Sequence, residues 1–245
     1  MTNEERIVLV TGAGSGIGRA TARAFAAQGA RVVAVGRGRP ALESTAAGHP
    51  AVDVLAGDLA ADGGPERIAA AVAERYGRLD VLVNNAGVVR SAPLGELRRE
   101  AVHEQVATNL VAPALLTRSV LPLLTAARGV VVNVSTSVGQ RGWPGNSVYA
   151  ATKAGLEALT RSWAVELAPK VRVVAVAPGA VDTPIVRDLP PERLAALRAW
   201  QLAHTPAGRI GRPAEVAWAI TQLADPAASF VTGAVLAVDG GAVVA

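Results

Sequence analysis

Two side chains that could carry acid/base chemistry, Tyr149 and Lys153, stand four residues apart in an alanine-rich segment of helical character. In a helix, residues at i and i+4 share one face, so the ammonium group could act on the phenol. A free tyrosine ionises at about pH 10, but a nearby cation stabilises the phenolate and brings proton transfer within reach. Because the chain has only two tyrosines and two lysines, the pair indicates chemistry. A surface tyrosine beside a solvated lysine is the alternative.

Hydroxyl and amide side chains accompany this pair. Ser135, Thr136 and Ser137 follow a hydrophobic run typical of a strand, where a hydroxyl could hydrogen-bond a substrate oxygen and stabilise developing charge. Asn109 lies inside a helical stretch, where asparagine has mediocre propensity. A functional or helix-bending role and a solvent-facing side chain are both open for Asn109.

A glycine-rich turn follows the first apolar run, with glycines at positions 12, 16 and 18 and a helical segment after them. Glycine allows positive φ and lets the backbone approach a pyrophosphate, while the helix N-terminus offers free amide groups. The spacing Gly-x3-Gly-x-Gly differs from the Gly-x-Gly-x2-Gly fingerprint. A dinucleotide site is the functional interpretation, and a tight turn without ligand is the alternative.

Two further residues could address the rest of a dinucleotide. Asp58 follows the third apolar run, where its carboxylate could accept the adenine amino group or simply cap a helix. Arg37 ends the second run, where an acid suits a ribose 2′-hydroxyl and an arginine suits a 2′-phosphate. The acid is missing there, so the sequence favours NADP over NAD.

The elements that must position these residues alternate along the chain. Near-continuous apolar strands separated by helical segments predict a doubly wound α/β fold, a parallel seven-stranded sheet flanked by helices on both faces. The expected strands are Ile7–Val10, Val32–Val35, Val52–Leu55, Val81–Val83, Val130–Val134, Val171–Val176 and Val235–Val238. Among the helix signals, Pro113 and Pro122 bracket a leucine-rich stretch. We expect a single domain over residues 1–245, with a mobile proline-rich flap at about 183–211.

Composition removes several classes of function. There is no cysteine and only three scattered histidines, so neither disulfides nor a metal site is expected. The net charge is +4 and the isoelectric point about 10.3, but the basic residues are dispersed, which argues against nucleic-acid binding. The apolar run at the N-terminus is too short for a signal peptide or a membrane span, so a cytoplasmic protein is expected.

Taken together, the motifs resemble those of the short-chain dehydrogenase/reductase family, in its shorter single-domain branch, essentially from end to end. The segments that carry the likeness are Thr11–Gly18, Asn84–Gly87, Tyr149–Lys153, Pro178–Gly179 with Asp182–Pro184, and Val238–Gly241. The resemblance implies a Rossmann-type fold and an oxidoreductase that transfers a hydride between NADP(H) and a carbonyl or secondary alcohol. It also implies a homotetramer, assembled through the long helices that contain Asn109 and Tyr149.

The resemblance also implies roles for individual residues. Tyr149 is then the general acid/base, Lys153 binds the nicotinamide ribose and lowers the pKa of the tyrosine, and Asn109 holds a water in a proton relay. Besides Tyr149 and Lys153, the expected cofactor-binding residues are Gly12, Ser15, Gly16, Ile17, Gly18, Arg37, Asp58, Leu59, Asn85, Ala86, Gly87, Pro178, Gly179, Val181 and Thr183.

Two positions depart from the family pattern. The serine that members place thirteen residues before the tyrosine is Thr136 here, which keeps the hydroxyl but adds a methyl and stiffens χ1. Ser137 supplying that hydroxyl through a shifted turn is the alternative. The basic residue that many NADP-using members carry before the second motif glycine is Ser15 here, which weakens the preference for NADP.

The substrate pocket is expected to be largely apolar, without an anion-binding arginine at its centre. Its expected residues are Thr136, Ser137, Gln140, Trp143, Tyr149, Val181, Ile185 and Val186. A medium-sized hydrophobic ketone, a secondary alcohol or an acyl thioester would fit. Two other functions stay open: a catalytically silent NADP-sensing protein, and an epimerase or dehydratase on the same fold.

Overall fold

A single parallel sheet forms the centre of the molecule, in a computed structural model that describes residues 5–137, 143–186 and 191–244. The strand order is β3-β2-β1-β4-β5-β6-β7, so the chain reverses its direction of winding between β1 and β4. The strands are β1 Ile7–Thr11, β2 Arg31–Gly36, β3 Val52–Ala56, β4 Val81–Asn84, β5 Val130–Val134, β6 Arg172–Pro178 and β7 Val235–Val238. The predicted fold class and all seven strands are confirmed: the bounds of β5 and β7 are as predicted, and those of the other strands shift by one or two residues.

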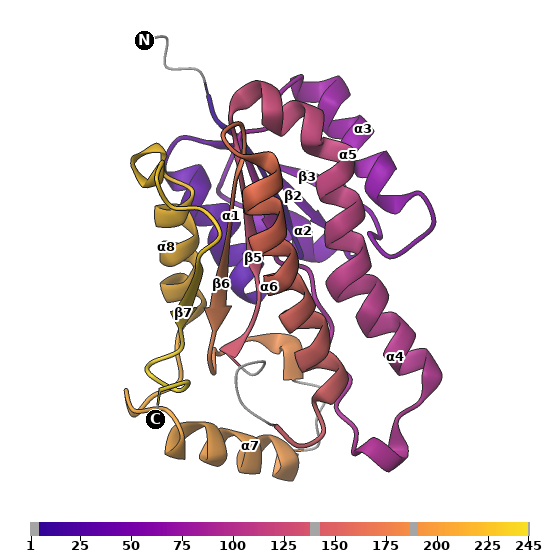
Figure 1. Ribbon diagram of the computed structural model, residues 1–245, viewed down its shortest axis with the longest axis vertical. Helices are drawn as coiled ribbons and strands as arrows, with labels where there is room; N and C mark the ends of the chain where they lie inside the picture. The colour runs from indigo at the N-terminus through magenta and orange to yellow at the C-terminus, as the bar shows by residue number, and fades with distance from the viewer. Residues whose placement is uncertain (1–4, 138–142, 187–190, 245) are drawn as a thin grey trace.

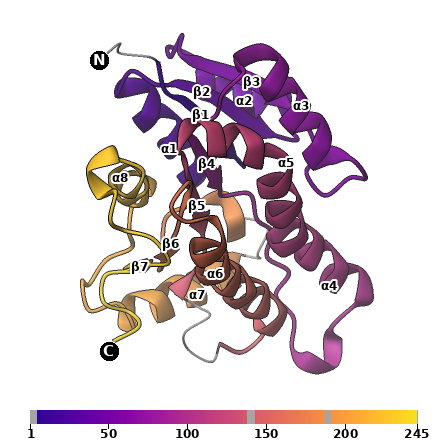
Figure 2. The same cartoon turned by 45° about the horizontal axis from the view of Figure 1, so that its top comes forward.

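Helices cover both faces of this sheet (Figures 1 and 2). They are α1 Gly16–Ala27, α2 Arg39–Ala46, α3 Gly64–Tyr76, α4 Arg99–Val106, α5 Ala112–Ala127, α6 Ser147–Leu167, α7 Pro191–Ala203 and α8 Pro213–Leu223. One hydrophobic core joins the sheet to α1, α2 and α8, and includes Phe25, Leu42 and Ile220. A second core on the opposite face joins it to α3, α5 and α6, and includes Val72 and Leu116.

The central strands are apolar on both faces because both faces are buried. All five residues of β1 and of β5 are buried, and β1 pairs in parallel with β2 and β4. Strands covered on both sides lose the alternation of polar and apolar residues that a solvent-facing sheet would show. Because the strands are parallel, their carboxyl ends meet at one edge of the sheet, which α7 crosses at the bottom of Figure 1.

One helix boundary suggested by the sequence is wrong. The bracketing prolines predict that a leucine-rich helix ends at Pro122, but α5 continues through it to Ala127. Pro122 is exposed, so the carbonyl group that its missing N–H leaves unpaired can bond to water. Pro113 directly follows the π-helical turn Ala107–Val111, which already interrupts the regular i to i−4 hydrogen bonding at the place where the proline lacks its N–H.

The helical stretch Arg99–Ala127 is long and apolar enough, by length and composition alone, to cross a membrane. It comprises α4, a π-helical turn and α5, and its inner face packs into the core with Leu116, Val120 and Leu124. Core helices of globular proteins meet the same length and hydropathy criteria. The stretch is therefore weak evidence for a membrane span.

Candidate active site

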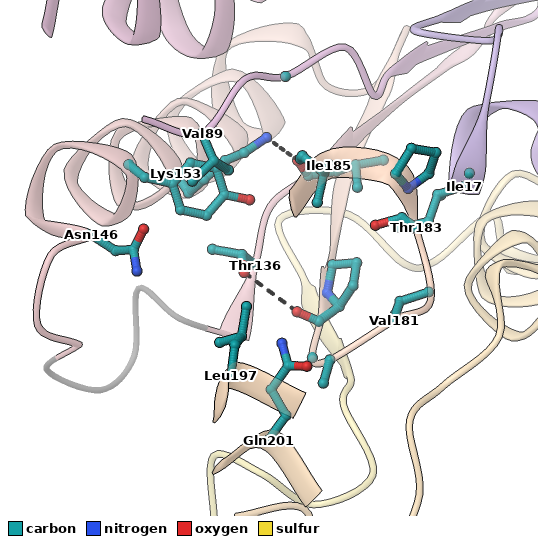
Figure 3. Close-up of a pocket in the computed structure, with 18 of the residues that line it drawn as sticks. Ile17, Val89, Thr136, Asn146, Lys153, Val181, Thr183, Ile185, Leu197 and Gln201 are labelled. Atoms are coloured by element: carbon teal, nitrogen blue, oxygen red, sulfur yellow. Dashed lines mark hydrogen bonds between the residues drawn. The ribbon is translucent and has the colours of Figure 1, made fainter. Parts of the chain in front are cut away.

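A cleft of about 540 Å³ opens at the carboxyl ends of β1, β4, β5 and β6, where doubly wound folds bind their ligands. Figure 3 shows residues from distant parts of the chain converging on it, among them Ile17, Thr136, Lys153 and Leu197. Of the predicted site residues, the cleft is lined by Gly12, Ser15, Gly16, Ile17, Gly18, Asn85, Gly87, Thr136, Trp143, Tyr149, Lys153, Pro178, Gly179, Val181, Thr183 and Ile185.

The glycine-rich turn brings backbone to the cleft in a conformation that larger residues resist. Gly12 and Gly16 have φ of 64° and 50°, in the left-handed region that favours glycine. A Cβ on Gly18 would collide with the Gly12 carbonyl oxygen and the Asn85 side chain. Since α1 begins at Gly16, the free amide groups of its first turn face this part of the cleft, where an anion would be stabilised.

A hydrogen-bonded strap ties the end of β4 to the end of β1. The Thr11 hydroxyl accepts hydrogen bonds from the backbone N–H groups of Asn85 and Ala86, both at 3.0 Å. In return, the Asn85 side chain donates to the Thr11 carbonyl oxygen at 2.8 Å. The strap therefore fixes the turn against β4, and the Asn85 side-chain amide donates to the protein backbone.

Thr136 and Tyr149 both line the cleft, and the Thr136 hydroxyl interacts with the Tyr149 phenol. The Thr136 hydroxyl also donates to the Pro178 carbonyl oxygen at 3.5 Å (Figure 3). Tyr149 lies in the first turns of α6, and Thr136 follows β5. Lys153, one turn after Tyr149, is only 3% exposed, and its Nζ lies 5.9 Å from the centre of the tyrosine ring. That Nζ donates to the Val134 carbonyl oxygen at 2.7 Å (Figure 3). The sequence pair is therefore brought together, and the ammonium group does not face bulk solvent.

Burial shifts the pKa of both groups. It raises the pKa of Tyr149 to about 12, and the neighbouring Thr136 hydroxyl opposes this rise. It lowers the pKa of Lys153 to about 8, because an ammonium group loses solvation inside the protein. The lowering of the tyrosine pKa that the resemblance implied is not seen here. The Lys153 ammonium group donates to the Val134 carbonyl oxygen and lies 5.9 Å from the centre of the ring. The loss of solvation is therefore the dominant effect, and the pKa of Tyr149 rises.

Asn109 is fully buried in the π-helical turn Ala107–Val111 between α4 and α5, so the solvent-facing alternative is wrong. Its Oδ1 accepts from the Val88 N–H at 2.8 Å, and its Nδ2 donates to the Val88 carbonyl oxygen at 2.9 Å and to Thr152 at 3.2 Å. A Cβ on Gly87 would lie 3.4 Å from Asn109 Oδ1 and 3.5 Å from Lys153 Nζ. Asn109 thus braces the segment beside Lys153 without lining the cleft.

The residues expected at the adenosine end lie outside the cleft lining. Arg37 is exposed after β2, and Asp58 is exposed after β3. The Asp58 carboxylate accepts from the Ala60 N–H at 2.9 Å in a local turn. It does not cap a helix, because α3 begins at Gly64 with Gly63 at its N-cap. Leu59 packs against the core on the α3 side, and Ala86 takes part in the strap through its N–H.

The segment after β6 lies opposite the glycine-rich turn. Pro178, Gly179, Val181 and Thr183 all line the cleft. A Cβ on Gly16 would come within 3.1 Å of the Thr183 side chain, so the two segments nearly touch. A dinucleotide lying along the turn would therefore meet the segment after β6 as well.

One predicted substrate residue, Ser137, is placed differently. Ser137 is 7% exposed and does not line the cleft, while Thr136 does, so the hydroxyl beside Tyr149 belongs to Thr136. Gln140 lies outside the described residues. The backbone of Val186 belongs to the short turn Pro184–Val186.

The sequence reasoning missed one wall of the cleft, which carries two arginines that the expected pocket residues did not include. Helix α7 contributes Arg193, Leu194, Leu197, Arg198 and Gln201 to the lining. Their spacing marks one face of a helix, but sequence alone does not say which face of a helix turns toward a site. Val89, Ser91 and Asn146 were also missed, and a hydrogen bond from Ser91 to Asn146 at 2.7 Å joins the two loops that hold them.

No group of three or more metal-ligating side chains is present among the residues that the structure describes. The cleft instead offers backbone amides, hydroxyls and amines. These groups suit a phosphate-containing organic cofactor and a carbonyl substrate.

Comparisons with known proteins agree with this geometry. A family model described as enoyl-(acyl carrier protein) reductase matches residues 12–243. The 3-oxoacyl-(acyl-carrier-protein) reductase FabG of Thermotoga maritima is 41% identical over 250 residues, covering 100% of both chains. The cis-4-hydroxycyclohexanecarboxylate dehydrogenase of Sinomonas cyclohexanicum is 46% identical and covers 97% of this chain and 96% of its own. A solved structure from Beutenbergia cavernae matches with a TM-score of 0.90 and 37% identity, covering 98% of this chain and 97% of its own. It is described as a candidate NAD(P)-dependent gluconate 5-dehydrogenase with NADP bound at low occupancy.

Proposed function

Because the chain belongs to the short-chain dehydrogenase/reductase family, we propose that it reduces a ketone to a secondary alcohol with NADPH, and catalyses the reverse oxidation. That it is an NAD(P)-dependent oxidoreductase acting on a small molecule follows from its relatives. The choice of NADP, the roles of individual residues and the assembly are our proposals. The observation that carries the residue roles is the contact between Thr136 and Tyr149 beside the buried Lys153.

The cleft fits the nicotinamide cofactor. The close packing at Gly12, Gly16 and Gly18 leaves backbone amides open where a side chain would otherwise stand. We propose that this turn holds the pyrophosphate, with Asn85, Ala86 and Gly87 on one side and Pro178, Gly179, Val181 and Thr183 on the other. When bound, the cofactor supplies or accepts the hydride, and the protein positions the reactants and handles the proton.

Tyr149 is the proposed proton donor in the reductive direction. With a pKa of about 12, its phenol keeps its proton at neutral pH and can pass it to the oxygen of a carbonyl as that oxygen gains charge. The Thr136 hydroxyl lies against the same phenol and would donate a second hydrogen bond to the substrate oxygen. Substrate oxygen held between these two groups is the arrangement that we propose.

Lys153 is proposed to hold the cofactor's ribose and to help Tyr149 recover its proton. Its pKa of about 8 leaves the ammonium group charged at neutral pH. Asn109, which braces Val88 and Thr152, would keep that region in place and hold a water in the proton relay. This relay is the role that the family resemblance suggested for Asn109.

Replacement of Tyr149 by phenylalanine tests the reaction. Loss of the phenol proton should lower kcat about 1,000-fold, since positioned acid/base groups contribute factors of about 10² to 10⁴. NADPH affinity should stay within about twofold, because Phe keeps the ring. The measurement is loss of reduced-nicotinamide absorbance over a ketone panel, with NADPH binding measured in parallel. Near-full turnover by Tyr149→Phe would refute the mechanism, and binding without turnover in the wild type would favour a sensing protein.

We base the preference for NADP on Arg37, because no acid stands at the end of β2 to accept a ribose 2′-hydroxyl. Arg37→Glu should weaken NADPH binding about tenfold and leave NADH binding unchanged or tighter. Arg39→Glu is the matched control, because Arg39 is equally exposed and pairs with Glu43 at 3.9 Å. An equal loss in both variants would argue against a specific phosphate contact.

We also propose a homotetramer that works in the cytoplasm, where its reduced cofactor is available. Exposed apolar side chains support the assembly: Val165 on α6 is 83% exposed, and Phe230, in the turn before β7, is 100% exposed. Light scattering at micromolar concentration should give four times the mass of the chain. A monomer there would overturn the assembly.

The segment at about 183–211 is proposed to act as a substrate flap of a single-domain enzyme. A bridge between Val181 and Gly211 closes its base. Its helix α7 has no buried residue, so little packing would be lost if it moved.

A further inference from the structure

The inner face of α7 combines two arginines with apolar side chains. Arg193 and Arg198 line the cleft with Leu194, Leu197 and Gln201. Figure 3 places Leu197 and Gln201 on the side of the cleft where Thr136 stands. This wall therefore adjoins the position proposed for the substrate oxygen.

The charged side chains among the described lining residues of the cleft have one sign. Its described lining contains three cationic side chains, Lys153, Arg193 and Arg198, and includes no aspartate or glutamate. Walls of one charge sign focus the field inside a cleft and attract ligands of the opposite sign. Lys153 is assigned to the cofactor and the reaction, which leaves the two arginines of α7.

The two arginines differ in how their charge is used. Arg198 donates to Asp182 Oδ1 at 2.8 Å, so a carboxylate already compensates its charge. Arg193 has no hydrogen bond or ion pair with any residue in the described part of the chain. Its guanidinium is exposed, so a ligand can reach its donors from solvent, and such a planar fork matches the two oxygens of a carboxylate.

Contacts of two other residues of α7 hold the helix that carries Arg193 at the cleft. The Trp200 ring lies 4.3 Å from the ring of Trp143, which itself lines the cleft. The ion pair between Arg198 and Asp182 joins the same helix to the segment after β6. With these two contacts made, α7 presents Arg193 to the cleft without burying any of its own residues.

We propose that Arg193 binds an anionic group on the substrate, so that the preferred substrate is a ketone or secondary alcohol bearing a carboxylate. This inference rests on the proposed reaction, because it assumes that the carbonyl lies between Thr136 and Tyr149. The apolar side chains Leu194 and Leu197 would then cover the hydrocarbon part between the carbonyl and the anion. The choice among substrates is made on α7, while the chemistry is done on α6 and after β5.

A pair of isosteric ketones tests the proposal, namely 4-oxocyclohexanecarboxylate and the neutral 4-oxocyclohexanecarboxamide. The wild type should favour the carboxylate at least about tenfold in kcat/KM, and Arg193→Gln should bring the ratio close to one. Arg193→Lys should keep part of the preference, because it retains the charge without the fork. Arg198→Gln should change the ratio less, since Asp182 already compensates that charge. Arg99→Gln is the matched control, as Arg99 is exposed outside the cleft.

A binding measurement separates this proposal from the proposed reaction. Cyclohexanecarboxylate cannot be reduced, and its binding to the enzyme with NADP⁺ can be followed by tryptophan fluorescence, because Trp143 lines the cleft. Arg193-dependent binding without reduction of any ketone would sustain the anion site and sink the reaction. Reduction of ketones with an unchanged ratio in Arg193→Gln would sink the anion site alone. A rise confined to the KM for NADPH would assign Arg193 to a cofactor phosphate and also overturn the proposal.

Discussion

The two ends of the cleft are built in different ways. At the cofactor end, formed by Thr11–Gly18 and Asn84–Gly87, backbone groups are held by hydrogen bonds and by glycines that have no space for a side chain. At the substrate end, formed by residues 143–147 and α7, side chains from separate segments meet through a few ring and ion-pair contacts. Steric constraint on a backbone restricts residue types strongly, whereas a wall of side chains can be assembled from many sequences. The first end should therefore tolerate little change, and the second should change specificity at little cost in stability.

The strongest test of a constrained cofactor end is Gly18→Ala. The new Cβ would overlap the Gly12 carbonyl oxygen, so the turn has to shift, and we expect a loss of about 3 kcal/mol in the free energy of unfolding. NADPH affinity should fall about 100-fold. Urea denaturation and fluorescence titration measure the two effects. Gly95→Ala is the control, because a Cβ added at Gly95 would meet no atom within 4 Å. If Gly18→Ala had the stability and NADPH affinity of the wild type, the cofactor end would not be sterically constrained.

Lys153 lies where the two ends meet, and its burial should appear as pH-dependent stability. Its folded pKa of about 8 lies below the ordinary value of 10.5, so the unfolded chain binds more protons between these pH values and folding stability rises with pH there. The stability of the wild type minus that of Lys153→Met should therefore increase by about 3 kcal/mol from pH 7 to pH 10.5.

The only other lysine of the chain, Lys170, is exposed and supplies the control for this measurement. The difference between the wild type and Lys170→Met should stay flat over the same pH range in urea denaturation. A flat profile for Lys153→Met as well would mean that the Lys153 amine is solvated.

A smaller effect is expected from Thr11→Val, which keeps the shape of the strap but removes its acceptor. The N–H groups of Asn85 and Ala86 would lose their partner, and we expect a loss of about 2 kcal/mol in the free energy of unfolding. Thr11→Ser retains the hydroxyl and should recover most of that loss. If Val and Ser variants were equally stable in urea denaturation, the strap would contribute nothing to the rigidity of this end.

The smallest change in stability should come from the substrate end. Trp200 is 39% exposed, so Trp200→Ala should alter the free energy of unfolding by less than about 1 kcal/mol. Loss of its contact with Trp143 should raise the KM for the ketone about threefold to tenfold, with the KM for NADPH unchanged. Trp200→Phe, which keeps an aromatic contact, should stay near the wild type. Equal shifts in both KM values would show that the two ends are not independent.

Much of the fold could be predicted from sequence because a sheet that is buried on both faces requires local runs of apolar residues. The seven apolar runs became the seven strands, since each strand of a covered parallel sheet needs apolar residues at nearly every position. The helix end suggested by Pro122 was wrong because proline is tolerated inside a helix where the carbonyl group that it leaves unpaired faces water. Which side of a helix faces water is decided by packing and not by the local sequence.

By itself, the sequence determined the glycine-rich turn and the pairing of Tyr149 with Lys153, because glycines in a strand-to-helix turn and residues at i and i+4 act through the local backbone. Only the tertiary structure decided that burial raises the pKa of Tyr149, that Thr136 and not Ser137 lies beside it, and that α7 turns Arg193 toward the cleft. Each of these depends on which distant segments pack together, and solvation, hydroxyl contacts and helix facing are properties of that packing.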